Sequence, residues 1–142
     1  MNLDNIFGAF EDDTPLKDKI TVLDFRETDA FKLGMFKKII WNQKNMLAKL
    51  DALKEHMPEL AEFMAIDKEE VSEFVTFTRA WAYIKDVDIT TEQGIDATRI
   101  FSDEYTITAC DLSIHFWEEK EEYEKCAHIK KIKDLITKNL PS

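Results

Sequence analysis

The stretch IDATRIFSDEYTITACDLSIHFW, residues 95–117, decides the fold. Wound as an α-helix at about 100° per residue, it gathers its polar side chains on one narrow stripe. With the next turn included, that stripe holds Glu104, Thr108, Asp111, His115 and Glu118. Most of the remaining circumference is apolar, and a helix coated in this way must be surrounded by neighbouring elements. The sequence therefore predicts a central core helix over about residues 95–117.

The composition favours long helices around this centre. Ten Phe, three Trp and three Tyr supply large apolar side chains, whereas three Gly and three Pro leave few places for turns. A chain of 142 residues fits one domain. We predict a single all-α domain over residues 1–142, a bundle of four to five helices that ends in a C-terminal helical hairpin.

Three further helices are predicted before the central one. The first runs from an N-cap at Thr28 or Asp29 to about Met57, where a following proline disfavours continuation. A short helix over residues 59–65 and a third helix over about 68–85 follow it. The face that the third helix is expected to bury consists of Val71, Phe74, Val75, Thr78, Trp81 and Ala82, widened by Phe77 and Ile84.

The entry into the central helix has its own capping signal. Thr90 and Gln93 have the spacing of a capping box. Gly94 follows directly and costs about 1 kcal/mol relative to Ala inside a helix. We therefore expect the helix to start a residue or two after this box.

Two short segments have the character of strands. Residues 19–25, KITVLDF, alternate in polarity and are rich in β-branched side chains, and residues 87–90 are the other short piece that could pair with them. Two pieces this short do not form a sheet that stands alone. We expect at most a minor short strand pair.

The C-terminal residues predict a hairpin whose second helix spans about residues 121–139. Its first turn is acidic and its last turns are rich in lysine, an order that suits the helix macrodipole. An unbroken helix through residue 118 would be too long for a compact domain of this size, so we expect a turn centred there. The turn would allow Cys110 and Cys126 to approach each other, either as reduced core thiols or as a redox-sensitive pair.

Residues 118–136, EEKEEYEKCAHIKKIKDLI, resemble the UVR motif. Glu122 to Ala127 match the turn and the start of the second helix of that motif, whereas Lys130 and Lys131 stand where the motif usually has Arg-Asp. UVR motifs are short helical hairpins through which bacterial excision-repair subunits and some protease adaptors contact their partners. The resemblance implies an interaction role for this hairpin.

The charge of the chain restricts its partners. It has 29 acidic and 19 basic side chains, a formal net charge of -10. Such a charge disfavours binding to nucleic-acid phosphates or to an anionic membrane, and it favours a partner with a basic surface. No apolar run reaches the length that spans a bilayer, and the first residues lack the basic start of a signal peptide. We expect a cytoplasmic protein that contacts neither membranes nor nucleic acid directly.

The polar stripe of the central helix is the best candidate for chemistry. Asp111 and His115 lie four residues apart, so the carboxylate could orient the imidazole as in a general-base pair. Glu118 could join them as a metal ligand. A solvated stripe with one ion pair is the alternative interpretation. Since the sequence has no HExxH, GxSxG, CxxC or glycine-rich phosphate loop, we predict neither enzyme activity nor a cofactor, with Asp111 and His115 as weak catalytic candidates.

Residues 1–13 form a short acidic and amphipathic segment. Its apolar side chains Leu3, Ile6, Phe7 and Phe10 fall at helical spacing. Such a segment could dock in the groove of another protein, or it could fold back and cover its own core.

Taken together, these features predict a small acidic protein-binding module. It would act as an adaptor or inhibitor that engages a basic partner surface, such as that of a nucleic-acid-associated enzyme, and mimicry of DNA charge is one form of this. The alternatives are a metal-binding or acid/base enzyme centred on Asp111, His115 and Glu118, and a structural subunit of a larger assembly. The oligomeric state is not predicted. The predicted partner-binding residues are Glu69, Glu70, Glu73, Asp103, Glu104, Asp111, Glu118, Glu119, Glu121, Glu122, Phe7 and Phe10.

Overall fold

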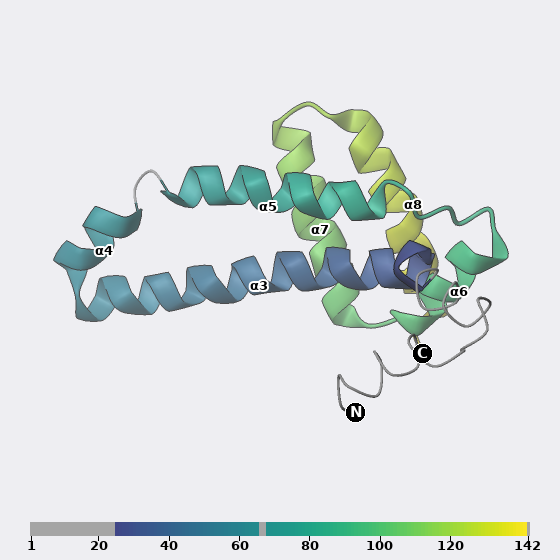
Figure 1. The fold of residues 1–142 in the computed structure, drawn as a ribbon, viewed down its shortest axis with the longest axis horizontal. Coiled ribbons are helices and arrows are strands. Elements are labelled where there is room, and N and C mark those ends of the chain that lie inside the picture. Colours follow the sequence, from purple (N-terminus) through teal and green to yellow (C-terminus); the bar gives the residue numbers. More distant parts are fainter. Residues whose placement is uncertain (1–24, 66–67, 142) are drawn as a thin grey trace, which may run out of the picture.

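The computed structural model describes residues 25–65 and 68–141, with residues 64–65 and 68–71 described by their backbone alone. The helices are α3 (Asp29–His56), α4 (Pro58–Ala65), α5 (Lys68–Ile84), α6 (Glu92–Ile100), α7 (Glu104–Glu119) and α8 (Tyr123–Asn139) (Figure 1). The predicted all-α bundle with a C-terminal hairpin is confirmed. Within the described residues, no helix combines the length and the apolar character needed to cross a bilayer.

Two helical pairs cross to form the bundle. α3 and α5 lie side by side and are joined by α4 at one end, while α7 and α8 run across this pair near its other end (Figure 1). The half of the α3–α5 pair that leads to α4 extends beyond α7 and α8 as a projecting arm (Figure 1). We define the arm as residues 44–75, which lie between Gln43, the last buried residue of α3, and Phe77, the first described buried residue of α5. The other described residues form the body.

The hydrophobic core lies in the body, where all the described helices except α4 meet. Its largest fully buried apolar side chains are Leu33, Phe36, Ile40, Ile84, Ile129, Ile132 and Ile136. The rings of Phe77 on α5 and Phe116 on α7 stack with their centroids 4.6 Å apart. Because burying one such side chain contributes about 1.5–3 kcal/mol, the body rather than the arm holds the fold together.

The start of α3 is where the sequence predicts it. Thr28 is the N-cap, and its hydroxyl accepts a hydrogen bond of 3.2 Å from the N–H of Phe31. The next residue, Asp29, is buried, and its Oδ2 accepts a hydrogen bond of 3.2 Å from the N–H of Asp88. Its own N–H donates to Oε1 of Gln93 at 3.2 Å. These bonds fix the beginning of α3 to the connection between α5 and α6 and to the first turn of α6.

The prediction of one continuous central helix is wrong, because the chain breaks between α6 and α7. Asp103 has an extended backbone, with φ -144 and ψ 163, and its carboxylate accepts a hydrogen bond of 2.8 Å from the N–H of Thr106. A side chain that pairs with a free N–H in this way favours a new helix start. α7 buries one face only, which consists of Thr106, Ala109, Cys110, Ser113, Phe116 and Trp117. Tyr105, which belongs to the apolar circumference of the predicted central helix, is 61% exposed.

The start of α6 differs from the expected capping box. Thr91 is the N-cap and accepts a hydrogen bond of 3.1 Å from the N–H of Gly94, whereas Thr90 donates to the carboxylate of Asp88. A Cβ atom on residue 94 would lie 1.8 Å from the carbonyl oxygen of Asp88. Only glycine permits that close approach, so Gly94 belongs in the first turn of α6 and does not delay its start.

The buried face of α5 agrees with the predicted one only at Phe77 and Ile84. Phe77, Ala80 and Ile84 are buried, as is expected for a helix that packs on α3 and α7. Trp81 of the predicted face is half-buried, and the side chain of Val71 is not among those described. The exposed residues of that face are Phe74, Val75, Thr78 and Ala82. Phe74 and Val75 lie in the arm, where no further helix of the described residues covers them.

The expected strand pair does not form in the described part of the chain. Residues 87–90 belong to the turns that connect α5 to α6. Residues 19–24 lie outside the described residues, and residues 25–27 form a helical turn before Thr28.

The turn between α7 and α8 is centred near Glu121 rather than residue 118. Glu121 has a positive φ of 58. Its N–H donates to the carbonyl of Glu118 at 3.0 Å, and the N–H of Glu122 donates to the carbonyl of Trp117 at 2.9 Å. These two bonds form a Schellman motif, whose left-handed position is usually glycine. A glutamate in this position is strained, because its Cβ approaches the following carbonyl oxygen.

Replacing the strained residue with glycine should therefore stabilise the protein. We expect Glu121→Gly to raise the free energy of unfolding by about 1 kcal/mol, measured by urea denaturation. Lys120→Gly is the matched control, because the neighbouring Lys120 has an ordinary φ of -88. The control should lower the stability by about 0.5–1 kcal/mol. Equal changes in the free energy of unfolding for the two variants would contradict the inference that Glu121 is strained.

Candidate partner-binding surface

Four of the predicted partner-binding carboxylates gather at the turn between α7 and α8. Glu118 and Glu119 end α7, Glu121 and Glu122 form the turn, and all four are exposed. The hairpin itself has the form that the resemblance to the UVR motif implies, with α8 starting at Tyr123. The structure therefore brings these acids together at one tip of the body.

The other predicted residues lie elsewhere. Glu104 is exposed in the first turn of α7, at the opposite end of that helix from the turn, and Glu73 is exposed on α5 in the arm. Glu69 and Glu70 are on α5 as well, and only their backbone is described. The N-terminal segment 1–13, with Phe7 and Phe10, lies outside the described residues. The predicted acids thus do not form one continuous surface.

Asp111 and His115, the weak catalytic candidates, do not pair with each other. Asp111 accepts a hydrogen bond of 2.6 Å from Nζ of Lys133 on α8, and this bond raises the pKa of the Lys133 ammonium. His115 lies 3.2 Å from the carboxylate of Glu119 instead. Across the described ranges, no group of three His, Cys, Asp or Glu side chains is arranged to hold a metal ion. The polar stripe lies at the surface, as in the alternative interpretation, but its ion pair joins Asp111 to Lys133 of α8.

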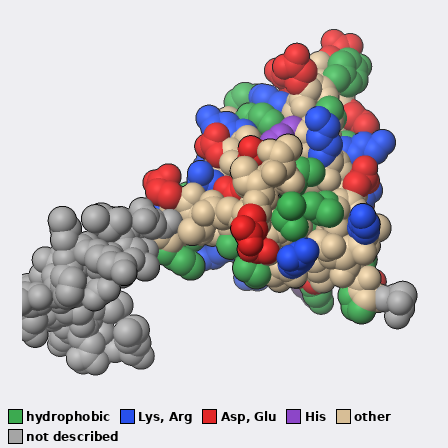
Figure 2. All heavy atoms as spheres, turned by 90° about the vertical axis from the view of Figure 1, so that its right-hand side faces the viewer, with side chains coloured by type: hydrophobic (Ala, Val, Ile, Leu, Met, Phe, Trp, Pro, Cys, Tyr) green, Lys and Arg blue, Asp and Glu red, His purple; other side chains and the backbone are tan. Residues whose placement is uncertain are grey.

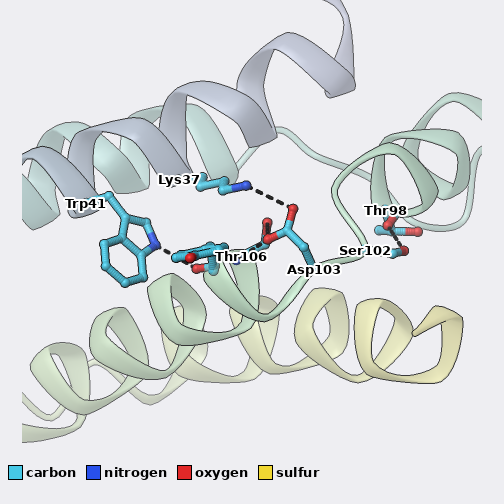
Figure 3. Close-up of polar contacts among 7 residues, drawn as sticks. Lys37, Trp41, Thr98, Ser102, Asp103 and Thr106 are labelled. Atoms are coloured by element: carbon cyan, nitrogen blue, oxygen red, sulfur yellow. Dashed lines mark hydrogen bonds and ion pairs between the residues drawn. The ribbon is translucent and has the colours of Figure 1, made fainter. Parts of the chain in front are cut away.

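Asp103 joins α7 to α3. Besides capping α7, its carboxylate lies 2.9 Å from Nζ of Lys37 (Figure 3). Burial by itself would raise the pKa of Asp103, but hydrogen bonds from Lys37 and Thr106 outweigh it and lower that pKa below its ordinary value of 3.8. A carboxylate already committed to two partners is a poor candidate for binding a third. We assign Asp103 a structural role.

An indole next to this ion pair strengthens the same junction. Nε1 of Trp41 donates a hydrogen bond of 2.8 Å to the carbonyl oxygen of Tyr105 (Figure 3). The rings of Trp41 and Tyr105 also meet edge to face, with centroids 5.1 Å apart. Trp41 therefore packs against α7 rather than standing free on the lysine-rich helix α3.

The two cysteines are core thiols. Cys110 and Cys126 are both buried and free. Burial, with a smaller contribution from Asp111, raises the pKa of the Cys110 thiol to about 12. Burial also raises the pKa of Cys126. Since the thiolate is the reactive form, neither cysteine is activated as a nucleophile.

The arm exposes apolar side chains to an unusual degree. Ala61 is the one buried side chain among those described in it. Its exposed large hydrophobic residues are Met46, Met57, Leu60, Phe63, Phe74 and Val75. Phe63 is 88% exposed, and Leu60 lies three residues before it on the same face of α4. Exposed apolar side chains gathered in one region typically mark an interaction site.

Carboxylates flank these apolar side chains. The two charged residues of α4, Glu59 and Glu62, are both exposed. Over residues 58–73 the sequence has six acidic side chains and one basic side chain. The end of the arm therefore combines apolar side chains with negative charge.

The body, by contrast, has a mixed surface. Figure 2 shows one face of it, on which acidic and basic side chains alternate over the helices. Neighbouring charges of opposite sign largely cancel each other's field, and salt at physiological ionic strength screens what remains beyond about 8–10 Å. On this face the net charge of the chain does not appear as one acidic field.

Comparison of this chain with protein-family models, with curated proteins and with solved structures finds no match. Its function is therefore inferred from the placement and chemistry of its own side chains.

Two substitutions at Asp103 test the junction between α6 and α7. Asp103→Ala removes the cap and should lower the free energy of unfolding by about 1–2 kcal/mol at neutral pH, measured by urea denaturation. Asp103→Asn keeps an oxygen that caps α7 and should cost less, because only the ion pair with Lys37 is lost.

The same variants predict a pH dependence. The folded-state pKa of Asp103 lies below 3.8, so its carboxylate stabilises the fold above that pH and loses this effect as the pH falls through the lowered pKa. The difference in the free energy of unfolding between the wild type and Asp103→Asn should therefore disappear in that acidic range. A difference that is the same there as at neutral pH would contradict the assigned ion pair.

Proposed function

We propose that this protein is a cytoplasmic protein-binding module, an adaptor or inhibitor, that engages its partner with the end of the α3–α4–α5 arm. Leu60 and Phe63 act as apolar anchors, and Glu59 and Glu62 face basic residues at the edge of the partner's binding site. The observation that carries this proposal is the 88% exposure of Phe63 on a helix that projects from the body (Figure 1).

The shape of the arm supports a macromolecular partner. A projecting pair of helices is convex, whereas small-molecule sites are concave and surround their ligand. An amphipathic helix that lays its apolar face into a groove is a common mode of protein recognition. Aromatic side chains placed in such a groove dominate the binding energy, and removing one typically costs more than 2 kcal/mol. Phe63 is the aromatic residue on α4 with that role.

The charge of the arm supports a basic partner surface. Glu59 and Glu62 alternate with the apolar anchors along α4, so a partner that buries Leu60 and Phe63 also meets these carboxylates. Lysine or arginine at the rim of its groove would attract them and speed association at low salt. A nucleic-acid-associated enzyme is one class of protein with such a surface. The acids at the α7–α8 turn would add to this attraction at longer range.

The proposal is tested with the partner isolated by affinity capture and then purified. The double variant Leu60→Ser/Phe63→Ser should weaken its binding at least tenfold, because the apolar anchors are lost. Tyr123→Ser is the matched control, since Tyr123 is an aromatic residue of α8 that is 64% exposed on the body. The control should bind as the wild type does, and calorimetry measures both.

Charge reversal on α4 separates the role of the acids from that of the anchors. Glu59→Lys/Glu62→Lys should weaken binding and reduce its dependence on salt. Unchanged partner binding by the Leu60/Phe63 variant would rule out the arm as the binding surface. A wild type that associates only with itself, independently of salt, would instead favour a structural subunit.

A further inference from the structure

A groove between α3 and α5 lies where the arm joins the body. It is open to solvent, has a volume of about 400 Å³ and is lined by side chains of both helices. Its position is set by Gln43 on α3 and by Thr76 and Arg79 on α5. The size is within the range of sites for small organic molecules, and the groove is separate from the apolar end of the arm at α4.

One polar side chain of this groove has no partner. Gln43 is 6% exposed, and its amide Nε2 is buried without a hydrogen-bond partner among the described residues. A buried amide that makes no hydrogen bond destabilises a protein, and such groups are rare in native structures. An acceptor in the groove would satisfy this N–H donor.

Two cationic side chains line the same groove. Lys38 and Arg79 line the groove, and neither forms an ion pair within the described ranges. No acidic side chain among the described residues lines the groove. In a chain with a net charge of -10, two cations in a groove that no described carboxylate lines favour an anionic ligand. The guanidinium of Arg79 is suited to bidentate pairing with a carboxylate.

The remaining surface of the groove is partly apolar. Met35, Ile39 and Met46 line it from α3. Methionine side chains are flexible and polarizable, so they adapt to apolar ligands of irregular shape. A purely polar anion such as phosphate would leave this part of the groove unused.

We propose that this groove binds a small organic carboxylate. Arg79 and Lys38 hold the carboxylate, the amide of Gln43 donates to one of its oxygens, and the apolar body of the ligand lies on Met35, Ile39 and Met46. The inference goes beyond the proposed protein-binding function and does not depend on it. Because the ligand contacts both α3 and α5, its binding also stiffens the base of the arm.

Straight-chain carboxylates from acetate to octanoate are the probes for this site. Binding is measured by calorimetry and by NMR of ¹³C-labelled methionine methyl groups. Hexanoate should shift the signals of Met35 and Met46 but not that of Met57, which lies at the far end of the arm. Hexanamide has the same chain without the charge and should not bind. If none of the carboxylates binds, the proposal is wrong.

Substitutions locate the carboxylate. Arg79→Gln should weaken hexanoate binding at least tenfold, whereas Arg99→Gln should leave it unchanged. Arg99 is an exposed arginine on α6 that already pairs with Asp96 at 3.4 Å, so it is a matched control. Equal binding of hexanoate and hexanamide would reduce the groove to an apolar site, and inorganic phosphate binding as tightly as hexanoate would make it a simple anion site. Either result overturns the proposal.

Gln43→Leu separates a ligand-binding role of the amide from a structural one. Leucine removes the unpartnered N–H group at similar volume, so the unfolding temperature should stay the same or rise while hexanoate affinity falls. A lower unfolding temperature with unchanged affinity would show that Gln43 serves the fold alone, and the assignment of its amide to the ligand would be wrong.

Discussion

The carboxylate of Asp103 makes two attachments on which the arrangement of the helices depends. One oxygen caps α7 through Thr106, and the other pairs with Lys37 of α3. The cap favours a new helix after α6, and the ion pair links the start of that helix to α3. α7 can then return through the Glu121 turn as the α7–α8 hairpin and cover one end of the α3–α5 pair. Among the helices that the structure describes, none besides α4 lies at the other end of the pair, and this end is the arm.

Helices with strong local signals were predictable from the sequence. The bounds of α3 follow from a capping threonine and a proline after Met57, and both act within a few residues. The hairpin follows from length alone, because a single helix would not fit a compact domain. The break at Asp103 was missed because apolar periodicity continues across Ser102 and Asp103. The sequence signal at this position is Asp103 itself. An aspartate can cap a helix by accepting a hydrogen bond from the N–H three residues later.

The functional surface was less predictable than the fold. Periodicity identifies an apolar face but not whether another helix will cover it, so Phe74 and Val75 were assigned to the core. Acidic side chains are visible in the sequence, but their partners are not. Asp111 and Asp103 pair with lysines far away along the chain, whereas Glu118 and Glu122 stay exposed. The groove at Gln43 depends on which side chains of α3 and α5 face each other, and local sequence does not contain that information.

The separation of arm and body has a consequence for how the molecule unfolds. Trp41, Trp81 and Trp117 all lie in the body, and residues 44–75 contain no tryptophan. With few buried contacts of its own, the arm belongs to the regions that open locally before global unfolding. Its amide protons should exchange with solvent sooner than those of α7 and α8, while tryptophan emission stays native. Tryptophan fluorescence therefore reports the unfolding of the body and does not detect local unfolding of the arm.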